Sequence, residues 1–217
     1  MRRHPDRRVH LVAAGALALA AAACGDAAGP AVEAGPRVAI APGGVTLDAL
    51  GELFRFEAAV YDATGGRVDA PRVTWESNTP TIATVDSTGT VRAVANGQAT
   101  VIARWENLEG SAAVVVQQRP GSFAKVSGDF QDGIAGQPLP EPLVARVADK
   151  YGHPIAGIPV YFRVVFGSGE FDMPTPVSGA DGIVSVRWTI PVPGEHTAQA
   201  SLTPGGTTPA HYNATVR

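Results

Sequence analysis

The stretch that decides the fold is Val73–Val101, VTWESNTPTIATVDSTGTVRAVANGQATV. Short runs of alternating apolar and polar residues are separated in it by turn residues, chiefly Asp86-Ser87-Thr88-Gly89 and Asn96-Gly97. An alternation with a period of two is typical of a strand with one buried face, and Asn-Gly is a strong hairpin signal. The stretch therefore predicts short strands joined by tight turns, with Asn96-Gly97 in a hairpin.

The same alternation extends on both sides of this stretch, and the chain from Arg37 onward shows no sustained helical period. A first unit is completed by the expected strands Leu53–Tyr61, Arg72–Glu76, Thr90–Ala95, Thr100–Trp105 and Ser111–Gln117. A second unit contains the expected strands Pro142–Asp149, Val160–Phe166, Val184–Ile190, His196–Leu202 and His211–Val216. The sequence Gln118–Ser122, QRPGS, separates the two units, and its shortness leads us to expect little freedom between them. Strands at such regular spacing indicate β-sandwiches.

Two of the expected strands assign particular side chains to a buried face. In Val160–Phe166, the alternation places Val160, Phe162, Val164 and Phe166 together on that face. In Val184–Ile190, it places Trp188 and its alternate apolar neighbours on that face.

Composition limits the possible classes of protein. The chain has 217 residues, 45% of them hydrophobic and 17% charged, with a formal net charge of −3. The hydrophobic fraction can build a core, and the charge argues against a nucleic-acid-binding protein. A single cysteine excludes an intrachain disulfide and a cysteine-based zinc site.

The N-terminus has the pattern of an export signal. Residues 1–10 carry four arginines, and the apolar run Leu11–Ala23 is shorter than the roughly 20 residues that a membrane-spanning helix needs. Cys24 follows three alanines at the end of this run, which resembles a bacterial lipoprotein signal and implies a lipidated Cys24 as the mature N-terminus. Ordinary cleavage at an A-x-A site is the alternative. Removal of residues 1–23 takes four of the 17 basic and one of the 20 acidic side chains, which leaves 13 and 19.

The first unit resembles the group 2 bacterial immunoglobulin-like domains. The resemblance is carried by a strand ending in Trp75, a Ser-Asn-Pro-like turn, an Ala-Thr-Val-Asp strand and small-residue strands around two glycines. These features correspond here to Val73–Trp75, Ser77–Pro80, Ala83–Asp86, Gly89, Val91–Ala95, Gly97 and Ala99–Thr100.

The second unit resembles the group 1 bacterial immunoglobulin-like domains of invasin- and intimin-like adhesins. An Asp-x-x-Gly-x-Pro-x-x-Gly loop and an Asp-Gly hairpin carry this resemblance. The matching residues are Gly136–Leu139, Pro142–Val144, Val147–Asp149, Gly152–Pro154, Ala156–Val160, Phe162, Gly167–Gly169, Asp181-Gly182 and Gly194–Ala200.

The predicted fold is therefore all-β, with two tandem immunoglobulin-like β-sandwiches after a signal peptide and a short linker. The predicted organisation is a signal peptide at 1–23, a lipidated cysteine and flexible linker at 24–36, a group 2 domain at 37–118 and a group 1 domain at 119–217.

No catalytic, cofactor or metal site is predicted. His153, His196 and His211 show no metal-ligand spacing, and the Gly167-Ser168-Gly169 turn shows no positioned base. The acidic residues expected in loops lack the D-x-D-x-D-G spacing of a calcium site, and we expect them to bond their own backbone. They are Asp129, Asp132, Asp149, Asp172 and Asp181.

These observations favour a non-enzymatic lipoprotein of the bacterial cell envelope, at the outer membrane or cell surface. Its modules are expected to act in binding or adhesion, or as a spacer. Its expected partners are the membrane, through the N-terminal lipid, and a protein or glycan ligand, but not nucleic acid. A carbohydrate-binding module with an exposed aromatic face is the alternative, and an accessory protein of a hydrolase is a weaker one. Trp75, Trp105 and Trp188 could form such a face, but strand positions favour core packing for Trp75 and Trp188.

Overall fold

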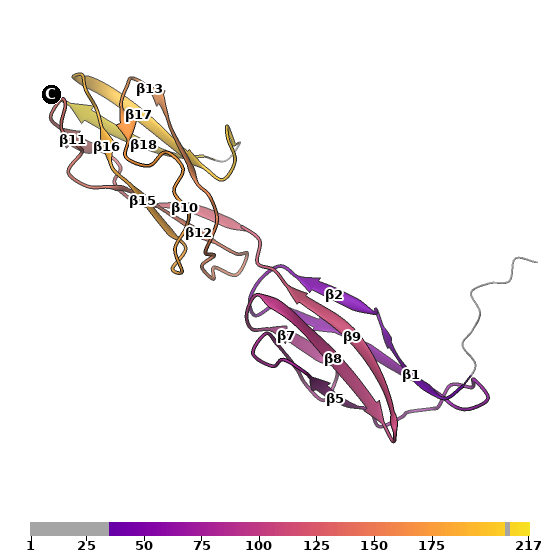
Figure 1. Cartoon of the computed structure of the whole chain (residues 1–217). Coiled ribbons are helices and arrows are strands. Elements are labelled where there is room, and N and C mark those ends of the chain that lie inside the picture. The colour runs from indigo at the N-terminus through magenta and orange to yellow at the C-terminus, as the bar shows by residue number, and fades with distance from the viewer. Residues whose placement is uncertain (1–34, 207–208) are drawn as a thin grey trace, which may run out of the picture. The chain divides into compact units, whose positions relative to one another are not determined.

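The structure is a computed structural model, and it describes residues 35–206 and 209–217 (Figure 1). The predicted signal peptide, Cys24 and most of the predicted linker lie outside the described residues. All regular elements of the described residues are strands, which confirms the all-β prediction. Residues 34–217 form one compact unit. In the described part of the chain, no helix is long and apolar enough to cross a membrane.

The paired strands fall into two sets that meet at Gln117–Gly121, with β1–β9 on the N-terminal side and β10–β18 on the C-terminal side. We call them the first and the second sandwich. The strands of the first sandwich are β1 (Arg37–Ala41), β2 (Gly44–Leu47), β3 (Leu53–Arg55), β4 (Glu57–Tyr61), β5 (Thr74–Ser77), β6 (Ala83–Val85), β7 (Thr90–Ala93), β8 (Gly97–Trp105) and β9 (Leu108–Val116). Those of the second are β10 (Ser122–Ser127), β11 (Gln131–Gly133), β12 (Leu143–Ala148), β13 (Tyr161–Phe166), β14 (Glu170–Phe171), β15 (Ile183–Val186), β16 (Trp188–Thr189), β17 (Gly194–Ser201) and β18 (Ala210–Val216).

In the first sandwich, the four-stranded sheet β2-β9-β8-β5 faces the smaller sheets β3-β7-β6 and β1-β4. The pairing of β2 with β9 is parallel, whereas all other strand pairs of this sandwich are antiparallel. Alternate residues of β7, β8 and β9 supply the core, including Val91, Val101 and Val114, none of which is exposed. The apolar residues that alternate in the sequence are thus the ones that face the core.

The expected strand Leu53–Tyr61 is divided in the structure. β3 pairs with β7, β4 pairs with β1, and Phe56 lies between β3 and β4. The Phe56 amide donates to the Gly89 carbonyl at 3.0 Å. Phe56 is 1% exposed and Val60 is not exposed, so residues at even spacing in this segment face inward although the segment serves two sheets.

The predicted hairpin at Asn96-Gly97 is wrong. β7 before it pairs with β3 and β6, and β8 after it pairs with β5 and β9, so the dipeptide carries the chain from one sheet to the other. Asn96 is used for hydrogen bonding instead, because its Oδ1 accepts from the Gln118 amide at 2.8 Å. The hairpin between the longest strands, β8 and β9, turns at Glu106-Asn107, where Glu106 has a φ of 52°.

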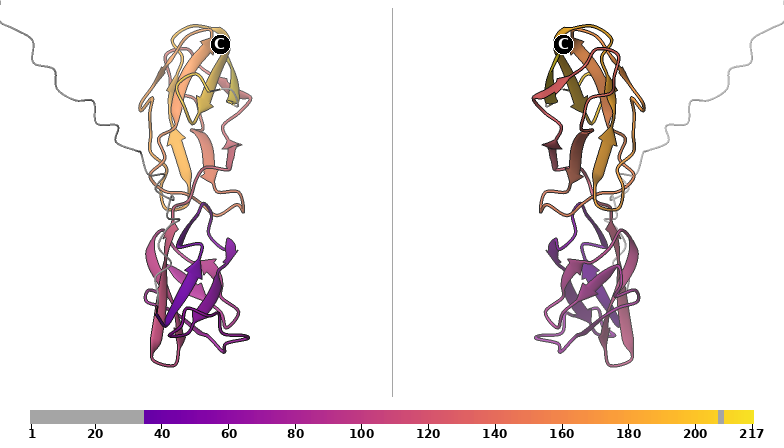
Figure 2. Two further views of the ribbon diagram at one scale, coloured as in Figure 1. Left: turned by 90° about the vertical axis from the view of Figure 1, so that its right-hand side faces the viewer. Right: turned by 90° about the vertical axis from the view of Figure 1, so that its left-hand side faces the viewer.

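The second sandwich repeats this plan with different strands. The sheet β11-β18-β17-β13 faces β10-β12-β15 and the short pair β14-β16, and the pairing of β11 with β18 is parallel (Figures 1 and 2). Its core contains Trp188, which is fully buried against Phe171 with ring centroids 5.8 Å apart. The assignment of Trp188 to the core is confirmed.

Two turns of the first sandwich have the same geometry. In Asp62–Gly66 and in Asp86–Thr90, the aspartate Oδ1 accepts from the amides two and four residues later, at 2.8–3.0 Å. The glycines Gly65 and Gly89 both have a φ of 81°, a conformation that glycine adopts without steric cost. Among the aspartates expected to bond their own backbone, Asp129, Asp149 and Asp181 do so through amides one or two residues later, whereas Asp172 accepts from the Arg187 amide 15 residues away.

Candidate functional site

The outer face of the sheet β11-β18-β17-β13 carries a polar surface. Glu195 on β17 lies opposite Thr215 on β18, and Thr215 is paired with Asp132 on β11. One step along the strands, Thr197 lies opposite Asn213, and the Thr197 hydroxyl donates to Asn213 Oδ1 at 3.1 Å. These side chains form the floor of a groove with a volume of about 480 Å³.

Phe130 and Phe166 also line this groove, and both are exposed. Phe130 immediately precedes β11 at one edge of the sheet, and Phe166 ends β13 at the other edge. Their exposed fractions are 81% and 61%. Two large apolar rings therefore flank a polar floor; we call this site the Phe130–Phe166 groove.

Phe130 is held in place by polar neighbours. Its amide donates to Asp129 Oδ1 at 3.0 Å, and the same oxygen accepts from the Asn213 amide at 2.7 Å. Burial opposes ionisation of Asp129, but the hydrogen bonds from Lys125 and Asn213 outweigh it and lower its pKa. On the other side, Gln131 Oε1 accepts from the Glu141 amide at 2.7 Å. Phe130 itself has a φ of 53°, which is unfavourable for a residue with a bulky side chain.

Phe166 was predicted to face the core, and the structure contradicts this. The register of β13 against β17 shifts between Val164 and Phe166, so the alternation breaks and the last ring turns outward. The next residue, Gly167, has a φ of 80°, and a Cβ there would collide with the His196 ring.

His196 supports the loop that follows Phe166. Its ring is 3% exposed, Nδ1 accepts from the Ser168 amide at 3.0 Å, and Nε2 lies 3.0 Å from the Val192 carbonyl oxygen. A nitrogen that accepts from an amide is unprotonated, and one that faces a carbonyl must donate, so the ring is the neutral Nε2–H tautomer. His196 is thus a structural residue beneath the groove.

The sequence did not reveal that Ser168 and His196 are neighbours. Both ring nitrogens of His196 are already engaged, so neither is free to take a proton from the serine hydroxyl. His153 and His211 lie elsewhere, and no group of three metal-ligating side chains occurs within residues 35–206 and 209–217. Asp132 lines the groove, and Asp129 accepts from the amide of Phe130 beside it. Asp172 and Asp181 accept from the backbone amides of Arg187 and Ile183.

The charge of the groove is negative. The carboxylates of Asp132 and Glu195 line it, whereas the nearby ammonium of Lys125 is paired with Asp129. A groove lined by carboxylates disfavours phosphates, sulfates and sialic acids, and accommodates uncharged or cationic groups. The tryptophans do not contribute, because none of the three lines the groove, and Trp75 and Trp105 are half-buried against the core of the first sandwich.

Comparison with known proteins supports the assignment of the first sandwich. The family model for the bacterial Ig-like domain (group 2) matches residues 56–116, which confirms the predicted resemblance for that part of the chain. The group 1 resemblance of the second sandwich stays a prediction. No curated protein matches the chain.

Solved structures of similar fold include surface-layer and adhesin proteins. The S-layer protein SbsC is 19% identical with a TM-score of 0.38, over 75% of this chain and 23% of that chain. The adhesin InvE of Yersinia pseudotuberculosis is 16% identical with a TM-score of 0.42, over 84% and 58% of the two chains. The Escherichia coli adhesin FdeC is 15% identical with a TM-score of 0.41, over 82% and 63%.

Proposed function

We propose that this chain is a non-enzymatic lipoprotein of the bacterial cell envelope that binds a ligand in the Phe130–Phe166 groove. Residues 1–23 direct export, Cys24 carries the lipid that holds the protein to the outer membrane or cell surface, and the sandwiches extend from that anchor. The partners are then the membrane, through the lipid, and a protein or glycan ligand. Nucleic acid is disfavoured by the acidic balance of the chain.

The observation that carries this proposal is the construction around Phe130. An aromatic ring that is 81% exposed contributes little to the core, and a positive φ on such a residue costs about 1–2 kcal/mol. Nevertheless Asp129 and Gln131 fix the backbone on both sides of it. Strained and exposed residues that are held by surrounding hydrogen bonds are concentrated at binding sites.

The non-enzymatic part of the proposal is supported by the chemistry of the groove. Its carboxylates, Asp132 and Glu195, lie on opposite sides of Thr215, with β18 between them. Its histidine has both nitrogens engaged. The groove therefore offers contacts for binding rather than an activated nucleophile with its base.

The test uses residues 25–217, which contain the whole compact unit, and defined immobilised ligands: peptidoglycan, matrix proteins and a glycan array. Phe130→Ala and Phe166→Ala are each expected to weaken binding at least tenfold. Val177→Ala is the matched control, because Val177 is 59% exposed and does not line the groove. Binding that survives both phenylalanine substitutions would contradict the groove, and no binding to any ligand would favour a spacer.

A carbohydrate ligand is the second candidate, and the arrangement of the floor favours it. Adjacent strands lie about 4.8 Å apart, so the floor extends roughly 14 Å across the four strands, a length suited to two or three sugar rings. Aromatic rings can stack on the apolar faces of sugars, while Asp132, Glu195 and Asn213 can bond hydroxyl groups. Neutral oligosaccharides should bind and sialylated or sulfated ones should not; preferential binding of a basic peptide would contradict the carbohydrate assignment.

A further inference from the structure

The aspartate turn Asp149–His153, in the second sandwich, is built like the two turns described in the first sandwich. Asp149 Oδ1 accepts from the amides of Tyr151 and His153 at 2.9 and 3.0 Å, and Gly152 has a φ of 85°. The glycine amide donates to the Asp149 carbonyl at 3.0 Å, as Gly65 and Gly89 do in their own turns. One carboxylate oxygen therefore closes the turn in all three cases.

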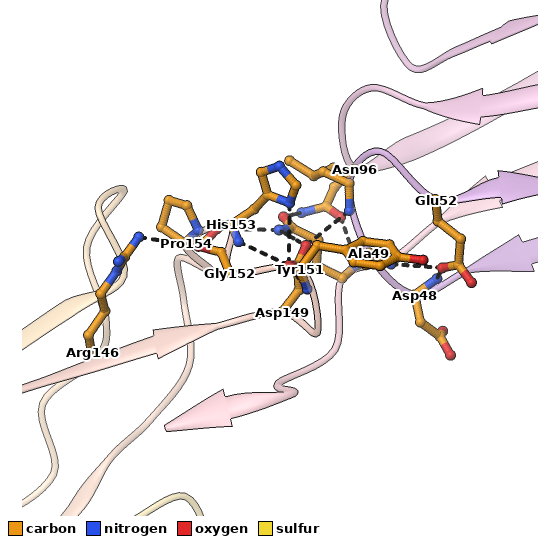
Figure 3. A network of polar contacts seen from close by, with 12 residues as sticks. Asp48, Ala49, Glu52, Asn96, Arg146, Asp149, Tyr151, Gly152, His153 and Pro154 are labelled. Carbon is orange, nitrogen blue, oxygen red and sulfur yellow. Dashed lines mark hydrogen bonds and ion pairs between the residues drawn. The ribbon is translucent and has the colours of Figure 1, made fainter. Parts of the chain in front are cut away.

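The second oxygen distinguishes Asp149 from the other two aspartates. Its Oδ2 accepts from the Leu50 amide at 3.0 Å and from Gln118 Nε2 at 3.0 Å. Figure 3 shows Asp149 with the turn residues Tyr151, Gly152 and His153. Leu50 follows β2 in the first sandwich, 99 residues away in sequence. Asp149 is completely buried, whereas Asp62 and Asp86 are exposed and, among the described residues, nothing donates to their Oδ2 atoms.

The partners of Asp149 Oδ2 are themselves held in position. Glu52 Oε2 accepts from the amides of Asp48 and Ala49 at 2.8 and 3.1 Å, which shapes the loop that presents the Leu50 amide. Glu52 Oε1 pairs with Lys150, the residue after Asp149. The contact is therefore made by ordered groups on both sides, with little conformational freedom left to lose.

Gln118 connects the boundary segment to both sandwiches. Asn96 Nδ2 donates to Gln118 Oε1 at 2.9 Å, so the orientation of the amide group is fixed from the first sandwich. Gln118 Nε2 then donates to Asp149 Oδ2 and also lies 3.3 Å from the Pro154 carbonyl oxygen. A Gln118 amide oriented in this way can only donate toward Asp149, so the acceptor there must be an oxygen.

We propose that the Asp149 turn is a latch: its Oδ1 keeps the turn folded, and its Oδ2 fastens the second sandwich to Leu50 and Gln118 so that the two sandwiches move together. The latch is independent of the proposed ligand, because none of its residues lines the Phe130–Phe166 groove. Opening would break two hydrogen bonds to a charged acceptor, and such bonds are stronger than hydrogen bonds between neutral groups.

The test is Asp149→Asn in residues 25–217. The asparagine oxygen can still close the turn, whereas the amide nitrogen that replaces Oδ2 would face two donors. Amide hydrogen exchange should be at least tenfold faster at Leu50 and unchanged at Tyr151 and His153. Residual dipolar couplings should give one alignment magnitude for both sandwiches in the wild type and differing magnitudes in the variant.

Asp86→Asn makes the same chemical change in a turn whose aspartate has no hydrogen bond to the second sandwich among the described residues. This control variant should leave the exchange rate of the Leu50 amide and the residual dipolar couplings unchanged. Gln118→Met removes one donor without touching the turn and should raise exchange at Leu50 by a smaller factor. Unchanged exchange at Leu50 in Asp149→Asn, or differing alignment magnitudes already in the wild type, would overturn the latch. Amide shifts elsewhere in each sandwich establish that the variants are folded.

Discussion

Alanine substitution at Gly89 and Gly65 separates backbone strain from packing. Both glycines occupy the same position of the same turn with a φ of 81°. A Cβ at Gly65 would meet nothing within 4 Å, whereas at Gly89 it would lie 2.8 Å from Trp75 Cζ2 and 2.9 Å from the Phe56 carbonyl oxygen. The strain of a left-handed alanine, about 1–2 kcal/mol, is common to both variants. Only Gly89→Ala adds overpacking, typically about 1–3 kcal/mol.

The expected loss in the free energy of unfolding is therefore about 1–2 kcal/mol for Gly65→Ala and about 2–5 kcal/mol for Gly89→Ala. The measurement is urea unfolding of residues 25–217, followed by tryptophan fluorescence, to which Trp75 and Trp105 contribute from the first sandwich and Trp188 from the second. An equal loss in the two variants would refute the argument, because it would show that Trp75 does not constrain the turn. A larger loss at Gly65 would refute the assumption that the two turns are equivalent.

Three further predictions concern the core, the carboxylates and the anchor. Trp188→Ala should lower the free energy of unfolding, measured in urea titrations, by about 3–5 kcal/mol, because Trp188 is fully buried. Trp75→Ala should lower it by less, because Trp75 is half-buried, and equal losses in the two variants would contradict this ranking. Burial raises the pKa of Asp149 and of Glu52, but their hydrogen bonds outweigh it and hold both below the ordinary values of 3.8 and 4.5. Since a lowered folded-state pKa stabilises the protein above the unfolded value, stability should fall as the pH drops below about 4.5, and less steeply in Asp149→Asn, as thermal unfolding between pH 3 and pH 7 would measure. Cys24→Ser in the full chain should abolish partition into a detergent phase; a wild-type protein that stays in the aqueous phase would contradict lipidation.

The all-β fold was predictable because the residues of its cores come from strands in which apolar and polar residues alternate regularly. Val184, Val186, Trp188 and Ile190 are all at most 3% exposed, as the period of two requires. The alternation, however, states only which side chains face inward and not which sheet a strand joins. For that reason the division of Leu53–Tyr61 at Phe56 was not visible in the sequence.

The groove could not be derived from the sequence in the same way. Phe166 continues a clean alternation, and only a register shift against β17, set by the partner strand, turns it outward. Asn96-Gly97 has the composition of a hairpin, but the sheets on either side of it differ. Phe130 did leave a signal in the sequence, because it is a large aromatic residue within the polar, glycine-containing run Gly128–Gly133, where no alternation assigns it to a buried face.

The parallel pairing of β2 with β9, and of β11 with β18, has a mechanical consequence. Each pair joins a strand near the start of a sandwich to the last strand of that sandwich, in the same direction. Tension between the two ends of a sandwich pulls such strands in opposite directions along their length. The hydrogen bonds between them are then loaded together in shear, not opened one after another, so each sandwich resists extension at its parallel pair.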